Sequence, residues 1–211
     1  MGWGAVATQL KEAKEKQEAF KRGDYNKSFV SFLSVKSGGE PAVISFIGDV
    51  SENGVEPWAA KVHTVPKPGT KQYSTFKCGG SQCPLCAGGD KAKFRVFFSV
   101  IDHRKRTFKF TKGDKAGQEG TSENQLCYYE ASAANADMLF QKFSKAAKKT
   151  GMKSLNEAVV EISKYGEGTA TTTSYDIEKR DNSYVIPPDV EPINFDELFA
   201  MSGSQEAPKY D

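Results

Sequence analysis

The sequence is poor in the residues that most enzymes use for proton transfer, because it has only two histidines among 211 residues. It contains no recognisable Ser or Cys nucleophile motif. It also lacks a glycine-rich loop followed by Lys and Ser or Thr, which would cradle a phosphate. Acidic residues are plentiful, but no pattern pairs them as an acid and a base. These absences argue against an enzyme.

Long apolar runs are absent too, and none approaches the roughly 20 residues that a membrane-spanning helix needs. Charged residues make up 27% of the chain. The start, Met1–Ala5, has no basic region followed by an apolar core, as a secretory signal would have. We therefore expect a protein of the reducing cytoplasm, without membrane contact, whose thiols are available to a metal.

Cysteines are few, but three of the four lie close together. Cys78, Cys83 and Cys86 follow His63 with the spacing H-x14-C-x4-C-x2-C. Three thiols and an imidazole form the tetrahedral set of ligands that Zn²⁺ prefers, and four protein ligands predict a closed, structural site. The glycine-rich segment around them has almost no apolar core of its own. Metal binding would therefore supply much of its folding free energy.

Other interpretations of these residues stay open. Cys127 competes with His63 for the fourth ligand position, and His103 competes more weakly. Cys127 lies in an apolar segment typical of a buried strand, where a free cysteine is more often a core residue. A redox dithiol formed by Cys83 and Cys86 is a further alternative, but Cys78 and the lack of a surrounding βαβ pattern argue against it.

Charge is distributed unevenly along the chain. Residues 189–211 carry a net charge of −5, which leaves +7 on the remainder of a chain whose total is +2. A basic body with an acidic tail suits a polyanion binder whose tail occupies the basic surface or recruits other proteins. An ordinary solvated terminus would have the same composition.

The pattern of apolar residues and glycine turns predicts a mostly β protein. A charged helix over residues 5–22 is expected as an arm, and a helix over 133–150 with Gly151 as its stop. We expect residues 112–124 to form a loop, and ordered structure to end at Pro188. The predicted strands cover residues 28–35, 41–49, 58–65, 93–102, 107–111, 125–129, 158–163 and 169–177, with 93–102 and 107–111 forming a hairpin.

Short strands with one helix between the late ones match a small closed barrel, the five-stranded OB-fold. The expected organisation is an N-terminal helical arm at 1–24, an OB-fold domain at 25–188 and an acidic tail at 189–211. A zinc-binding β-ribbon or knuckle would be inserted at about 63–90.

Aromatic and basic residues interleave in several predicted strands, as in proteins that stack bases on rings and hold phosphates with cations. Because side chains alternate along a strand, Arg95 and Phe97 share the face opposite Phe94 and Phe98, and are the expected ligand-facing pair. The candidate nucleic-acid-binding residues are Tyr73, Phe76, Lys77, Arg95, Phe97, Arg104, Lys105, Arg106 and Lys109.

Three segments of the sequence carry a family resemblance: His63 with Lys77–Asp90, Phe98–Asp102, and Tyr165–Tyr175. Together they resemble the zinc-containing single-stranded DNA-binding proteins of tailed bacteriophages, over roughly residues 28–190. The arrangement is also similar to that of T-even phage helix-destabilising proteins, in which a His/Cys3 zinc subdomain is inserted in an OB-fold.

This resemblance implies a protein that coats and protects single-stranded DNA in phage replication, recombination and repair, in the host-cell cytoplasm. It implies self-association on DNA through the N-terminal arm, and recruitment of replisome or recombination proteins through the acidic tail. The tail here is only moderately acidic, and the N-terminal helix has a mixed charge. A zinc-ribbon adaptor that binds proteins is the alternative, and a duplex or RNA binder is a third hypothesis.

Overall fold

The computed structural model describes most of the chain. The described residues are 30–48, 50–51, 54–55, 57–66, 73–110, 113–167 and 171–200. The N-terminal arm expected at residues 1–24 and the end of the acidic tail, residues 201–211, lie outside them. Within the described part of the chain, no helix is long and apolar enough to cross a bilayer.

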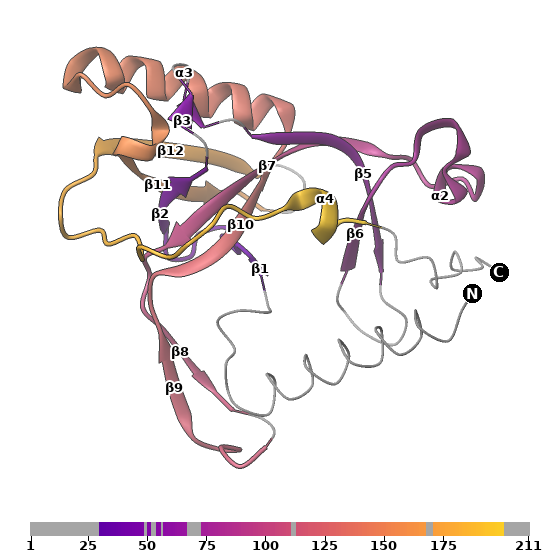
Figure 1. Cartoon of the computed structure of the whole chain (residues 1–211), viewed down its shortest axis with the longest axis horizontal. Coiled ribbons are helices and arrows are strands. Elements are labelled where there is room, and N and C mark those ends of the chain that lie inside the picture. Colours follow the sequence, from indigo (N-terminus) through magenta and orange to yellow (C-terminus); the bar gives the residue numbers. More distant parts are fainter. Residues whose placement is uncertain are drawn as a thin grey trace.

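One mixed sheet of eight strands forms the centre of the molecule (Figure 1). Its main path runs β1, β10, β7, β2, β11, β12, while β5 pairs with β7 and carries β6. β1 is parallel to β10, and the other ladders are antiparallel. The strands are β1 (Ser31–Phe32), β2 (Ala42–Ile47), β5 (Trp58–Pro66), β6 (Tyr73–Lys77), β7 (Lys93–Asp102), β10 (Gln125–Ala131), β11 (Ala158–Tyr165) and β12 (Thr172–Lys179).

Strand β7 organises the sheet, because both of its edges are paired. One edge pairs with β10 over residues 96–102. The other edge pairs with β5 over residues 93–97 and with β2 over residues 99–102. The ribbon of β5 and β6 is thereby attached to the same strand that forms the middle of the sheet.

The main core lies between the sheet and helix α3 (Ala133–Thr150). Side chains of β7 alternate between the two faces, so Phe98 packs in this core while Phe97 belongs to a second apolar cluster on the opposite face. The hydroxyl groups of Tyr129 and Tyr175 lie 2.6 Å apart inside the core. Burial of this hydrogen-bonded pair raises the pKa of both tyrosines.

Helix α3 has the bounds that the sequence predicts. Ser132 caps it, since its side chain accepts a hydrogen bond from the N–H of Asn135. Gly151 ends it with φ of 73°, a left-handed conformation that glycine adopts without steric strain. An amphipathic face with a cap at each end is therefore enough to locate this helix from sequence.

The predicted hairpin between residues 93–102 and 107–111 is wrong. β7 pairs with β10, whereas β8 (Arg106–Lys109) pairs with β9 (Glu119–Ser122), inside the segment expected to be a loop. Gly120 weakens the strand signal there, and the ring of Phe108 packs closely over it: a Cβ atom at this position would lie 2.8 Å from that ring. The β8–β9 hairpin projects away from the main sheet (Figure 1).

The sheet does not close into the expected barrel within the described residues, since β1 and β12 remain the two ends of its path. Closure would need β10 to pair with β12. The free edge of β10 is instead taken by β1, with Ser31 opposite Cys127 and Phe32 opposite Tyr128. The mostly β class with few helices is confirmed.

The prediction that ordered structure ends at Pro188 is wrong. The chain continues over the sheet as far as residue 200 and includes the helical turn α4 (Phe195–Leu198). Phe195 and Phe199 are buried in the second apolar cluster, which explains why this acidic segment is held. The remaining short elements are β3 (Val50–Ser51), β4 (Gly54–Val55), η1 (Gly80–Gln82), α2 (Pro84–Ala87) and η2 (Leu155–Glu157).

Candidate metal centre and ligand-binding face

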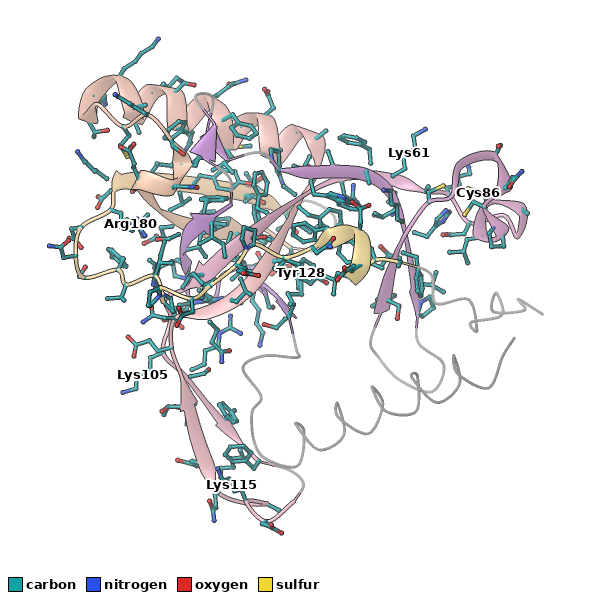
Figure 2. All side chains as sticks on the ribbon, viewed as in Figure 1. Lys61, Cys86, Lys105, Lys115, Tyr128 and Arg180 are labelled. Carbon is teal, nitrogen blue, oxygen red and sulfur yellow. The ribbon has the colours of Figure 1, made fainter. Side chains whose placement is uncertain are left out.

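The β5–β6 ribbon brings His63 next to the cysteine segment. His63 lies opposite Phe76 in the ladder. β6 ends at Lys77, so Cys78 is the first residue after this strand. The N–H of Cys78 donates to the carbonyl oxygen of Lys61 at 2.8 Å, which extends the pairing beyond the strand end. Figure 2 shows Cys86 beyond the end of β6, at the side of the molecule and away from the body of the sheet.

Two helical turns place the other two thiols. The turn η1 links Cys78 to Cys83, and Gly80 within it has φ of 73°, which residues with a side chain rarely adopt. Helix α2 begins at Pro84, where proline fits because its fixed φ suits a first helical position and no N–H is required there. Cys83 and Cys86 are thereby directed at one point.

The four ligand atoms have the spacing of a tetrahedral metal site. The Nε2 atom of His63 lies 3.3 Å from the Sγ of Cys83 and 3.4 Å from the Sγ of Cys86. The sulfur atoms of Cys78 and Cys86 are 3.6 Å apart, and all four atoms lie within 4.8 Å of one another. Zinc with bonds of about 2.3 Å to sulfur and about 2.0 Å to nitrogen would separate its ligands by roughly 3.5–3.8 Å. The group can therefore hold a metal ion.

Asp90 orients the imidazole. Its Oδ2 atom lies 2.6 Å from the Nδ1 of His63, which is fully buried. Because the carboxylate only accepts, Nδ1 carries the proton and Nε2 is left to face the three thiols. A histidine that binds a metal through one nitrogen commonly donates to a carboxylate through the other. Asp90 is the last residue of the cysteine segment, but the sequence analysis did not identify it as the partner of His63.

The electrostatics of the group also favour a cation at its centre. Burial alone would raise the pKa of Cys83, but hydrogen bonds from the backbone of Cys86, Gly79 and Leu85 outweigh it and lower the pKa to about 6. The neighbouring Cys78, together with burial, raises the pKa of Cys86 to about 11. Several thiolates at this spacing repel one another, and a divalent cation would remove that repulsion.

The two competing ligands lie elsewhere. Cys127 is buried in the main core beside Ser31, and burial raises its pKa. His103 donates from Nδ1 to the Oδ1 of Asn124 at 2.7 Å and accepts at Nε2 from the hydroxyl of Ser45 at 2.9 Å. This Ser–His–Asn chain has the connectivity of a hydrolytic triad, but Ser45 is fully buried and its hydroxyl does not reach solvent. It ties β2 to the segment before β10.

A cluster of aromatic side chains lies on the face of the sheet opposite α3, and we call it the aromatic face. It consists of Trp58 on β5, Phe97 on β7 and Tyr128 on β10. Trp58 is opposite Phe97 in the ladder, and their ring centroids are 5.4 Å apart. Sequence reasoning found Phe97 but missed the other two; for Tyr128 the same alternation, applied to β10, would have indicated its side of the sheet.

Phe97 faces away from the main core, as the alternation predicts, but it is not exposed to solvent. Its exposed fraction is 0%, because Phe195 and Phe199 cover it. The expectation of an accessible Phe97 is therefore wrong for this state of the chain. The cover comes from a segment about a hundred residues away, which strand periodicity cannot reveal.

Arg95 lies on the same face as Phe97 and is partly exposed. Its Nε donates to the Oε1 of Glu130 on β10 at 2.8 Å. The guanidinium thus stands beside the aromatic face with one of its donors engaged by a carboxylate. This position agrees with the predicted ligand-facing pair.

Arg104 and Arg106 are not free to line a groove as expected. Asp102 is buried and accepts hydrogen bonds from both guanidinium groups, at 2.8 and 2.6 Å between its Oδ2 and their NH2 atoms. The side chain of Arg104 is only 9% exposed. A buried carboxylate needs such partners, so these two arginines fix the base of the β8–β9 hairpin.

The hairpin itself presents cations and rings to solvent. Lys105 and Lys109 are exposed, and Lys109 pairs loosely with Glu119 at 3.7 Å. Phe108 and Phe110 share a face of the hairpin, with ring centroids 5.1 Å apart. Figure 2 places Lys105 near its base and Lys115 near its tip.

The three candidates on β6 have different surroundings. Tyr73 is 66% exposed. Phe76 packs against the apolar cluster around Cys83 and Leu85, so it belongs to the ribbon core. Lys77 pairs with Asp196, its Nζ lying 2.5 Å from Oδ1, and lies over the ring of Trp58. Of these, only Lys77 adjoins the aromatic face.

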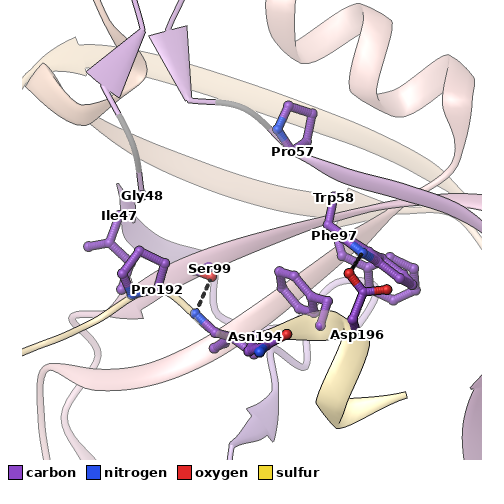
Figure 3. Close-up of a pocket in the computed structure, with 11 residues that line it drawn as sticks. Ile47, Gly48, Pro57, Trp58, Phe97, Ser99, Pro192, Asn194 and Asp196 are labelled. Atoms are coloured by element: carbon purple, nitrogen blue, oxygen red, sulfur yellow. Dashed lines mark hydrogen bonds between the residues drawn. The ribbon is translucent and has the colours of Figure 1, made fainter. Parts of the chain in front are cut away.

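A hollow of about 300 Å³ lies where the C-terminal segment meets the sheet (Figure 3). Trp58, Phe97 and Ser99 line it from the sheet, and Pro192, Asn194 and Asp196 line it from the C-terminal segment. The N–H of Ile193 donates to the hydroxyl of Ser99 at 2.9 Å beside it. The segment therefore does not fill the whole face.

The metal group and the aromatic face are defined by their geometry and chemistry alone. They lie on one continuous piece of sheet, because β5 contributes a residue to each. Comparison with known proteins adds no family: no protein-family model matches the chain, and no curated protein is detectably similar to it.

Proposed function

We propose that this chain is a single-stranded DNA-binding protein without sequence preference, and that it carries one structural zinc ion. It would coat and protect single strands during phage DNA replication, recombination and repair. The observation that carries the proposal is the position of Phe97 and Tyr128 on neighbouring strands of the sheet, on the face away from α3.

The connectivity of five strands supports an OB-like fold. Taken in chain order, β2, β7, β10, β11 and β12 are five strands with α3 between the third and the fourth. The first pairs with the second and the fourth, the second with the third, and the fourth with the fifth. These ladders support the strand order of a five-stranded, partly open Greek-key barrel. The third and fifth strands contact each other through Tyr129 and Tyr175, whose hydroxyls lie 2.6 Å apart and whose rings meet edge to face.

The outer face of the second and third strands is where OB-folds bind oligonucleotides. In this chain those strands are β7 and β10, which carry Phe97 and Tyr128, with Trp58 of β5 adjoining. Stacking of a base on an aromatic ring contributes about 1–3 kcal/mol and tolerates any base. Three rings on one face therefore suit a binder that does not distinguish sequences.

Cations lie beside these rings. Arg95 is on the same face, and Lys77 lies over Trp58 at the junction with the ribbon. Lys105 and Lys109 are further exposed cations, on the β8–β9 hairpin. Such cations would follow the phosphates, so binding should weaken as salt is added.

Zinc would be structural in this protein. His63, Cys78, Cys83 and Cys86 supply four ligands, which leaves no open position for a water or substrate. The ion would fix the end of the β5–β6 ribbon at which β6 leads into Cys78. Through Lys77, which precedes Cys78, it would also fix one border of the aromatic face. Self-association through residues 1–24 and recruitment of replication proteins through the tail remain part of the proposal, on segments that are largely outside the described residues.

The proposal is tested by fluorescence anisotropy of labelled oligo-dT, titrated with protein at low and moderate salt, with duplex DNA as competitor. Binding that weakens with salt and is not displaced by duplex supports it. Absence of binding at low salt would overturn it. Absence of oligo-dT binding is also what a zinc-ribbon adaptor would give. The structure does not favour that alternative, because the expected docking peptide of the adaptor, residues 193–199, is packed on the chain's own sheet.

A further inference from the structure

A second hollow, of about 320 Å³, adjoins the one at the aromatic face. Ile47, Gly48 and Pro192 line both hollows, so the two share a wall. Arg180 lines only the second, and Figure 2 shows Arg180 on the opposite side of the molecule from Cys86 of the metal group. We infer that the second hollow is a binding site for one nucleotide. This inference does not rest on the proposed function, because a free nucleotide tests the site directly.

The walls of the second hollow are mostly apolar. Ile47, at the end of β2, contributes from the sheet, while Ile186, Val190 and Pro192 contribute from the C-terminal segment. A turn shapes that segment here, since the N–H of Val190 donates to the carbonyl oxygen of Pro187 at 3.3 Å. Ligand pockets enclose about 300–1,000 Å³ and are lined mainly by apolar side chains. The hollow therefore suits a small organic molecule with an apolar body.

A single cation, Arg180, stands at this hollow. It directly follows β12, and its N–H donates to the carbonyl oxygen of Glu157 at 2.8 Å, which fixes the backbone there. Arg95, Arg104 and Arg106 each pair with a carboxylate, whereas the side chain of Arg180 has no such partner among the described residues. A guanidinium group with free donors binds a phosphate through its planar fork. The hollow thus offers a place for one phosphate.

An acceptor at the hollow lacks a donor. The Nδ2 atom of Asn156 donates to the carbonyl oxygen of Gly48 at 3.3 Å, and this contact sets which way the amide is turned. Within the described residues, the Oδ1 atom of Asn156 is the one buried side-chain oxygen or nitrogen without a hydrogen-bond partner. A buried acceptor left unpaired destabilises the empty site. Because each nucleobase carries an N–H on its Watson–Crick edge, an entering base would supply the missing donor.

These groups together favour a nucleotide over other small ligands. Inorganic phosphate would pair with Arg180 but leave the apolar walls and Asn156 without a partner. A fatty acid has no N–H to donate to Asn156. An amino acid would bring an ammonium group, and no carboxylate among the described residues lines the hollow to balance it. A nucleoside monophosphate combines a flat apolar body, an N–H donor and a phosphate.

Isothermal titration calorimetry of the full chain with thymidine 5′-monophosphate tests this site, and thymidine is the matched ligand without a phosphate. Arg180→Gln should weaken binding of the monophosphate at least about tenfold, because a charge-assisted hydrogen bond is lost. The same variant should bind thymidine as the parent chain does. Lys179→Gln is the matched control, since it removes a charge from the neighbouring, exposed residue that does not line the hollow.

A change in the ligand tests Asn156 without altering the chain. Thymidine 5′-monophosphate methylated at N3 has no N–H on its base, so the parent chain should bind it at least about fivefold more weakly than the unmethylated nucleotide. In Asn156→Leu this difference between the two ligands should vanish. A difference of the same size in both proteins would mean that Asn156 does not contact the base, and would contradict its place in the site.

Two results would overturn the inference: no binding of the monophosphate even at millimolar concentration, or equal affinities in Arg180→Gln and Lys179→Gln. Neither result bears on oligo-dT binding at the aromatic face, so the proposed function is judged separately. Oligo-dT with and without a 5′-phosphate separates the two sources of the nucleotide. If Arg180→Gln weakens binding of the phosphorylated oligonucleotide alone, the site holds the end of a strand. If it weakens only the free monophosphate, the ligand is a free nucleotide.

Discussion

The Nδ1 atom of His63 lies 2.6 Å from the Oδ2 atom of Asp90, and this contact directs the other ring nitrogen at three thiols. The imidazole is completely buried, so it has no freedom to turn toward water. Asp90 is therefore a positioning residue for the metal centre rather than a ligand.

Asp90→Asn should weaken metal binding about 10–100-fold, the usual effect of removing a carboxylate behind a ligating histidine. The amide is similar in shape but does not stabilise the protonated Nδ1 as a carboxylate does. Competition with a chromogenic zinc chelator measures the change. Asp114→Asn, in the exposed turn of the β8–β9 hairpin, is the matched control. Equal zinc affinity in both variants would mean that Asp90 does not support the site.

Removal of the metal should loosen residues 63–90 while leaving the main sheet folded, because the ribbon has a small core of its own and the sheet has a large one. Hydrogen exchange with and without chelator should show lost protection in the ribbon, and the melting temperature should fall. Cys86→Ser should lose the bound metal and Cys127→Ser should keep it, since Cys127 lies in the main core. A melting curve indifferent to chelator, with no metal in the purified protein, would contradict the assignment.

Local patterns in the sequence were sufficient where the interaction was itself local. Helix α3 was placed by an apolar face, and the metal group by the spacing of three thiols and one histidine over 24 residues. The face of Phe97 followed from simple alternation along β7. In each case the residues that decide the structure are neighbours along one element or one short ribbon.

Features that depend on distant segments were not predictable in this way. The choice of β10 as partner for β7 joins segments separated by the whole β8–β9 hairpin. Phe97 is buried because Phe195 and Phe199 cover it. Arg104 is held in an ion pair because its partner, Asp102, is buried and needs a counter-charge. Periodicity reports which side of a strand a residue faces, but not what covers that side.

Asp102→Asn should destabilise the fold by about 3 kcal/mol, because it removes the negative charge that balances two guanidinium groups, one of them nearly buried. The hydrogen bond and charge of Asp102 raise the pKa of Arg104. An arginine is not deprotonated in proteins even without such a partner, so the variant leaves a nearly buried guanidinium charged and without its counter-charge. Urea unfolding measures the free energy change. Asp137→Asn on the exposed side of α3 is the control, and equal stability of the two variants would contradict a buried ion pair at the hairpin base.

Acidification should lower stability through His103. Burial lowers its pKa below the ordinary value of 6.5, and Arg180 lowers it too, although Asn124 and Asp102 act in the opposite direction. Below about pH 6.5 the unfolded chain therefore binds a proton that the folded chain resists, so the free energy of unfolding decreases as pH falls. His103→Gln should remove this part of the pH dependence. The metal centre responds to pH in both proteins, so the difference between their urea curves at pH 7.5 and 5.5 isolates His103, and identical slopes would refute the assignment.

Arg95→Ala should weaken oligo-dT binding and also reduce its dependence on salt. Each phosphate neutralised on a single strand contributes about −0.7 to the slope of log affinity against log salt, so loss of one cation should make the slope shallower by about that amount. Lys148→Ala is the matched control, because Lys148 is an exposed cation near the end of α3, on the other side of the sheet. Anisotropy titrations at four salt concentrations give both slopes. If Lys148→Ala changed the slope and Arg95→Ala did not, the bound strand would have to run over the helix side rather than across the aromatic face.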